Sequence, residues 1–135
     1  MPNVEEIKRQ DTIQLKETLS LPKDWKVERI EQRDISYFIP RCYMYEWQYR
    51  DEEDLICTPL AILCQVKEKS SSGYCYWHGV RFHPFTKEFI YCSSGFGTQG
   101  YGLEQSSEKV MSWDDCLKQF DHLAEPILVN QDIFD

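Results

Sequence analysis

Cys92 and His78 could together form an activated nucleophile, in which an imidazole takes the proton of a thiol. They lie on two strand-forming runs, residues 74–82 and 88–92, which are separated by the turn sequence His83-Pro84-Phe85-Thr86-Lys87. Aromatic and β-branched runs on both sides of a proline-containing turn predict a β-hairpin. The first question is therefore whether the hairpin brings the two side chains together.

The register of the hairpin decides this. If Lys87 takes the left-handed position of a bulged hairpin, Phe82 lies opposite Glu88. His78 then lies opposite Cys92, and a cysteine-dependent enzyme is one interpretation. The alternative is a half-buried histidine beside an inert core cysteine. A slip of one residue would turn every side chain to the other face of the ribbon.

A zinc site is a second chemistry that these residue types suggest. Cys75-x-x-His78, with His83 and Cys92 nearby in the sequence, has the right ligand types. Residues three apart on a strand point to opposite faces, so Cys75 and His78 cannot bind one ion without a bulge. We therefore expect no metal site.

The glycines after the hairpin match a nucleotide-binding motif only in letters. Gly95-x-Gly97-x-x-Gly100 has the spacing of the dinucleotide fingerprint. That fingerprint requires a parallel βαβ unit and a helix that begins at the glycines, and this sequence predicts an antiparallel hairpin followed by poor helix formers. We expect no cofactor here, and we expect residues 93–102 to form a recognition loop.

A row of large aromatic side chains is the most specific feature of the chain. On a predicted strand at residues 41–50, Tyr43, Tyr45, Trp47 and Tyr49 share one face. The row could be core, or it could be a binding surface, because tyrosine and tryptophan are typical of interface hot spots and their polar groups need partners. A third interpretation is a small-ligand pocket between this strand and the hairpin, lined by Tyr45, Trp47, Trp77 and His78.

The charge excludes some classes of partner. The chain has 23 acidic and 15 basic residues, a net charge of -8, which repels nucleic acids and anionic membranes. Residues 104–135 alone contain eight acidic and two basic residues. This excess favours a partner with a basic surface, although acidic side chains on a solvated helix face would also keep the protein in solution.

The fold expected from these patterns is α+β in one domain of residues 1–135. An antiparallel sheet of four to six strands, a meander with a central hairpin, should be flanked by an N-terminal helix at residues 3–19 and a C-terminal helix that Ser112 caps. Strands are also expected at residues 25–31 and 58–67, and the apolar tail from residue 127 should dock on the body. Both faces of the hairpin are apolar, so we expect both to be covered.

The location and function follow from the same features. Residues 1–21 contain no apolar stretch for a signal peptide, and we expect six reduced cysteines in a cytoplasmic protein. We expect a non-enzymatic protein-binding module, such as an inhibitor, an immunity-type neutraliser or an adaptor, whose partner is another protein with a basic surface. The residues expected to contact that partner are aromatic or acidic: Tyr43, Tyr45, Trp47, Tyr49, Phe96, Tyr101, Glu108, Asp121 and Glu125.

Overall fold

A single sheet organises the chain. The computed structural model describes residues 4–29, 60–68, 75–96, 103–123 and 126–134. Its helices are α1 (Val4–Thr18), α3 (Trp113–Leu117) and α4 (Gln131–Phe134). Its strands are β1 (Val27–Arg29), β2 (Leu60–Glu68), β3 (Cys75–Phe82), β4 (Phe89–Phe96), β5 (Leu103–Val110) and β6 (Ile127–Val129).

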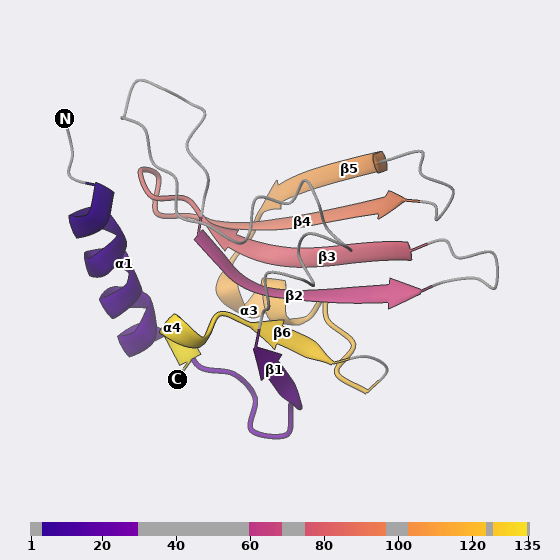
Figure 1. The fold of residues 1–135 in the computed structure, drawn as a ribbon, viewed down its shortest axis with the longest axis horizontal. Coiled ribbons are helices and arrows are strands. Elements are labelled where there is room, and N and C mark those ends of the chain that lie inside the picture. Colours follow the sequence, from indigo (N-terminus) through magenta and orange to yellow (C-terminus); the bar gives the residue numbers. More distant parts are fainter. Residues whose placement is uncertain (1–3, 30–59, 69–74, 97–102, 124–125, 135) are drawn as a thin grey trace.

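The described strands form a six-stranded sheet in the order β1-β6-β2-β3-β4-β5. Strands β2 to β5 are an antiparallel meander, and β1 pairs with β6 in parallel. Figure 1 shows α1 and α4 at one end of the sheet and α3 behind it. The predicted α+β class, the strand number and the flanking helices are confirmed.

The apolar tail docks as predicted. Strand β6 lies between β1 and β2, so the end of the chain enters the sheet. Ile127, Leu128 and Val129 are all buried, as is Ile133 in α4. A segment this apolar gains more from burial than from solvation, at about 1.5–3 kcal/mol for each large aliphatic side chain.

The predicted hairpin register is wrong by one residue. The turn closes with the His83 amide donating to the Glu88 carbonyl at 2.9 Å, so four residues, 84–87, make the loop. Phe82 therefore pairs with Phe89, and not with Glu88. Lys87 does have the predicted left-handed conformation, with φ of 60°. It ends a four-residue turn, whereas the expected register would have left a turn of three residues, 84–86.

Two further predictions after the hairpin are wrong. Residues 93–96, expected in a loop, continue β4, and the next described segment returns as β5. The C-terminal helix does begin as expected, with the Ser112 hydroxyl accepting the Asp115 amide at 3.1 Å, but α3 ends at Leu117. Leu123, expected on its buried stripe, is 87% exposed.

The main core lies on the sheet face that α3 covers. Strand residues Leu60, Leu63, Val80 and Phe82 pack there with residues from outside the sheet: Leu15 of α1, Cys116 of α3, Phe120 and Ile133. On the opposite face Ala61, Cys64, Arg81 and Cys92 are also buried. The expectation that both faces are covered is confirmed for these strands.

Apolar packing and an ion pair hold helix α1 to the rest of the fold. Leu15 is buried in the core cluster. Asp11, also buried, forms an ion pair with Lys87 in the hairpin turn, with 2.9 Å between Oδ1 and Nζ. A buried carboxylate without a partner is costly, so moving the helix away from the turn would cost free energy. The ion pair therefore holds the middle of α1 against the turn.

The described helices include none that is long and apolar enough to cross a membrane. The predicted strand at residues 41–50, with its aromatic row, lies outside the described residues, as do Tyr101 and Glu125.

Candidate functional site

The candidate nucleophile and base lie on opposite faces of the sheet. In the observed register Cys92 pairs with Gly79, and His78 pairs with Ser93. The Cys92 thiol donates to the Gly79 carbonyl at 3.6 Å. Burial raises the pKa of this thiol to about 11, although the nearby Arg81 guanidinium opposes the shift. The Cys92/His78 pair is therefore not an activated nucleophile, and this interpretation is wrong.

His78 instead takes part in a buried network of hydrogen bonds. Its Nε2 lies 2.9 Å from the Gln65 Oε1, and its Nδ1 lies 3.1 Å from the Tyr91 hydroxyl. Gln65 also contacts the Asp121 backbone: its Nε2 donates to the Asp121 carbonyl at 2.5 Å, and its Oε1 accepts the Asp121 amide at 3.2 Å. His78 and Gln65 are both fully buried.

These contacts fix the tautomer of His78. The two bonds to the Asp121 backbone orient the Gln65 amide, because a carbonyl can only accept and an amide N–H can only donate. The Gln65 oxygen must then accept from His78, so the proton of the neutral ring is on Nε2. Nδ1 is left as an acceptor for the Tyr91 hydroxyl. In this arrangement both ring nitrogens of neutral His78 have a hydrogen-bond partner, which indicates a structural role for the network.

Aromatic rings cover this network and connect it to the N-terminal segment. The Phe120 ring stacks on the His78 ring at 4.4 Å between centroids. Trp25 packs beside Phe120 at 6.1 Å and stacks on His122 at 5.8 Å. The predicted ligand pocket with His78 in its lining would need that ring accessible, and Phe120 covers it. Of the other expected walls, Trp77 precedes His78 on β3, and Tyr45 and Trp47 lie outside the described residues.

Arg81 is a buried cationic residue of the sheet. Its guanidinium forms an ion pair with Glu108 across β4, and it lies beside the Cys92 thiol. The Glu108 side chain is 61% exposed, so the pair is half in solvent. Glu108 therefore has a structural role as well as any role at the surface, because it is a counter-charge of a buried cation.

The structure describes three of the nine predicted partner-binding residues: Phe96, Glu108 and Asp121. Glu108 and Asp121 are exposed, but Glu108 shares the sheet face of Arg81, whereas Asp121 binds Gln65 on the other face. The two acids do not form one rim. Phe96 ends β4 opposite Leu103. Tyr43, Tyr45, Trp47, Tyr49, Tyr101 and Glu125 lie outside the described residues.

Strand β5 is a feature that the sequence did not predict. It pairs with β4 on one side, and no other described strand pairs with its second edge. Residues 107–110 are exposed, and Val110 is exposed by 54%. The Met111 amide donates to the Phe89 carbonyl, so by antiparallel alternation the backbone groups of Glu108 and Val110 point to the open edge.

The sequence of β5, Leu-Glu-Gln-Ser-Ser-Glu-Lys-Val, explains why it was missed. It has few β-branched residues and no alternation of apolar and polar side chains, so neither strand signal is present. The sequence of this segment argued only against a helix, because serine is unfavourable in helix interiors. The pairing with β4 supplies the strand geometry.

The zinc and nucleotide patterns fall largely within β3 and β4, and Gly97 and Gly100 lie outside the described residues. Among the described residues, no group of three or more histidine, cysteine or acidic side chains is placed to hold a metal ion. Gly95 pairs with Gln105 in the antiparallel ladder of β4 and β5, where the fingerprint would need a parallel strand and a helix.

Comparisons with known proteins add no relative. A scan against protein-family models and searches of curated proteins and of solved structures each found no match to this chain. The function is therefore inferred from the side chains and the strand edges of the described residues.

Proposed function

We propose that this chain is a non-enzymatic protein-binding module whose partner adds an extended strand to the open edge of β5. The observation that carries the proposal is this edge: Glu108 and Val110 present backbone donors and acceptors outward, and residues 107–110 are exposed. An unpaired strand edge is a template for strand addition by another protein. Backbone hydrogen bonds would supply affinity, and the side chains beside the edge would supply specificity.

The choice against an enzyme rests on the thiol chemistry. Cys92 was the one nucleophile for which the sequence offered a base, and its pKa is raised to about 11 by burial, with the nearby Arg81 opposing the shift. At neutral pH a thiol of this kind is protonated and inert. His78 is committed to Gln65 and Tyr91 within the core.

A basic partner is favoured by long-range charge. The net charge of -8 attracts cationic surfaces within a Debye length, which speeds encounter more than it strengthens the final complex. Asp114, Asp115 and Asp121 are exposed around α3, away from the Arg81 face. We infer that these acids steer a basic protein, while contact is made at β5 and at the aromatic row of residues 43–49.

A cytoplasmic location is part of the same proposal. Cys92 and Cys116 are free thiols, which suits a reducing compartment. Inhibitors, neutralisers and adaptors all act by such strand or surface contacts, and the partner's identity would decide among them.

The test uses a backbone substitution that leaves the fold intact. Val110→Pro removes an outward N–H and no bond to β4, and proline is accepted on edge strands at such positions. Val110→Thr is the matched control, because it keeps both the N–H and nearly the same shape. The native chain and both variants would be used to capture proteins from cells of the source organism, with quantitative mass spectrometry as the readout.

A host protein retained by the native chain and by Val110→Thr but lost with Val110→Pro would support the proposal. Retention by Val110→Pro would exclude β5 as the contact. If no host protein is enriched by the native chain over an unrelated acidic protein, the binding function itself is wrong. Urea unfolding of the two variants checks that each is folded.

A further inference from the structure

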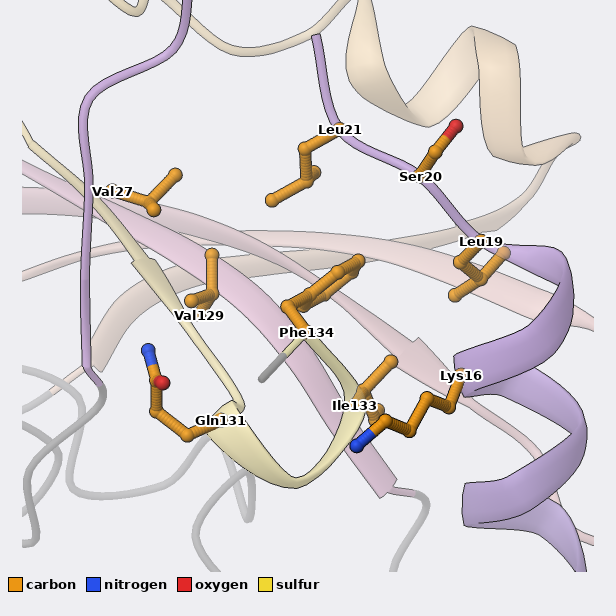
Figure 2. A pocket seen from close by; sticks show the side chains of 9 residues that line it. All are labelled: Lys16, Leu19, Ser20, Leu21, Val27, Val129, Gln131, Ile133 and Phe134. Carbon is orange, nitrogen blue, oxygen red and sulfur yellow. The ribbon is translucent and has the colours of Figure 1, made fainter. Parts of the chain in front are cut away.

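A pocket of about 370 Å³ lies where the end of α1 meets the β1–β6 edge and α4 (Figure 2). Its walls are mostly aliphatic and aromatic: Leu19, Leu21, Val27, Val129, Ile133 and Phe134. Segments far apart in the sequence build it, since residues 19–27 contribute one side and residues 129–134 the other. Its size is at the lower end of the range of about 300–1,000 Å³ that is typical of small-molecule sites.

The depth and the mouth of the pocket differ in exposure. Val129 and Ile133 belong to the core cluster and are buried, so they form a fixed floor. Val27 is 42% exposed and lies on an edge strand, so it stands at the mouth. An apolar chain that entered here would cover the exposed part of Val27 and the partly buried Leu21 and Phe134, which pack on the core cluster and are already in place. Such a preformed apolar site lowers the cost of binding.

A single cation borders these apolar walls. The Lys16 side chain extends from the last turn of α1 toward the α4 side of the pocket (Figure 2). Among the described residues Lys16 has no acidic partner. Gln131 and Ser20 are the other polar residues of the lining. In a chain with a net charge of -8, a cation beside an apolar cavity favours ligands with a negative head and an apolar body.

We propose that this pocket binds a small amphipathic anion, a medium-chain carboxylate such as decanoate, with its carboxylate at Lys16 and its alkyl chain against Leu21 and Phe134. The two chemistries of the ligand match the two chemistries of the lining. A carboxylate at Lys16 forms a charge-assisted contact, and the alkyl chain gains the transfer energy of buried methylenes. This site is separate from the β5 edge, which lies at the other end of the strand order.

Lys16 also has a structural role that the test must separate. A basic residue in the last turn of a helix interacts favourably with the helix dipole. Replacing it could therefore weaken α1 slightly without any ligand. Lys23, an exposed lysine outside the pocket lining, provides a matched control for the loss of one positive charge.

The experiment is a titration of the full chain with octanoate, decanoate, dodecanoate and decanol, followed by calorimetry and by NMR of methyl-labelled protein. We expect decanoate to shift the methyl signals of Leu19, Leu21 and Val27. Decanol, which lacks the charge, should bind more weakly. Lys16→Met should weaken decanoate roughly tenfold, the loss of about one charge-assisted contact, and leave decanol unchanged.

Further variants decide between this site and general adsorption. Lys23→Met should bind decanoate as the native chain does. Val27→Trp, which fills the mouth from an exposed position, should abolish the shifts at Leu21 while the protein stays folded. The proposal is overturned if decanoate shifts methyls elsewhere and not these, if Lys16→Met and Lys23→Met weaken binding equally, or if decanol binds as tightly as decanoate.

Discussion

The hydrogen-bond network of Gln65 and His78 gives the sharpest test of how this core is built. Replacing Gln65 by leucine keeps nearly the same volume, so the change removes hydrogen bonds and leaves no large cavity. Three groups lose a partner: the His78 Nε2–H and the amide and carbonyl of Asp121. The experiment therefore measures polar satisfaction and not packing.

The size of the effect follows from the burial of each group. The His78 ring is fully buried, and a buried donor without an acceptor costs about 1–3 kcal/mol. Asp121 is exposed, so water can replace its lost bonds, and only the net value of about 0.5–1.5 kcal/mol is at stake. Gln65→Leu should therefore destabilise the fold by about 2–4 kcal/mol, a large part of the about 5–15 kcal/mol typical of a domain.

The assay is urea unfolding followed by circular dichroism, with the slope required to stay constant between variants. Gln119→Leu is the matched control for the change from glutamine to leucine. Gln119 is exposed and lies two residues before Asp121, so this substitution should change stability by less than about 0.5 kcal/mol. Gln65→Leu combined with His78→Leu removes donor and acceptor together. The double variant should then be less destabilised than the sum of the single variants by about 1–2 kcal/mol.

Two results would refute the reasoning. One is strict additivity in the double-variant cycle, which would mean that Gln65 and His78 do not satisfy each other. The other is a direct observation by ¹⁵N NMR that neutral His78 carries its proton on Nδ1, since the orientation of the Gln65 amide requires the proton on Nε2.

Three other predictions follow from single side chains. The His83 Nδ1 accepts hydrogen bonds from the backbone amides of residues 85 and 86, both at 3.2 Å. Burial lowers the pKa of this imidazole below its ordinary value of 6.5. Its contribution to stability is therefore complete above pH 6.5 and is lost as the pH falls through the lower pKa of the folded state. The melting temperature should fall more between about pH 7.5 and 5.5 for the native chain than for His83→Asn, which keeps an acceptor that does not titrate; equal slopes would contradict this. Burial raises the thiol pKa of Cys92 to about 11 and of Cys116 to about 12, so a thiol reagent at about pH 8 should modify them only after unfolding. The free energy of unfolding should fall as the pH rises above 9, the ordinary thiol pKa, because the thiols then ionise in the unfolded chain and stay protonated in the fold. Leu15→Ala should cost about 2–5 kcal/mol in urea unfolding, whereas Ile13→Ala, on the exposed side of α1, should cost under about 1 kcal/mol; similar losses would mean that α1 does not dock as described.

The surface acids allow a salt test only if they are chosen with the structure in view. The sequence predicts that Glu108 contacts a basic partner, but this residue also forms an ion pair with buried Arg81. Replacing Glu108 by glutamine would therefore mix a loss of stability with a loss of steering. Asp121 carries no such ion pair among the described residues, and its substitution by asparagine keeps an acceptor for the Leu123 amide. That variant reports on association alone.

Features decided within a few residues could be read from the sequence. The left-handed Lys87 in the proline turn, the Ser112 cap and the helix of residues 4–18 all depend on local sterics and local hydrogen bonds, which the side chains nearby supply. The α+β class and the docking of the tail followed from the distribution of apolar residues, because burial is proportional to apolar area whatever the partner is.

What only the tertiary structure decided is how these elements meet. A turn of four residues instead of three moved the hairpin register by one, and since side chains alternate on a strand, this placed His78 and Cys92 on opposite faces. The polar sequence of β5 became a strand because β4 offered it a ladder, and α3 stopped at Leu117, after which the backbone of Asp121 pairs with Gln65, 56 residues away. Pairings at that distance depend on which long-range contacts satisfy buried polar groups together, and no local pattern contains that information.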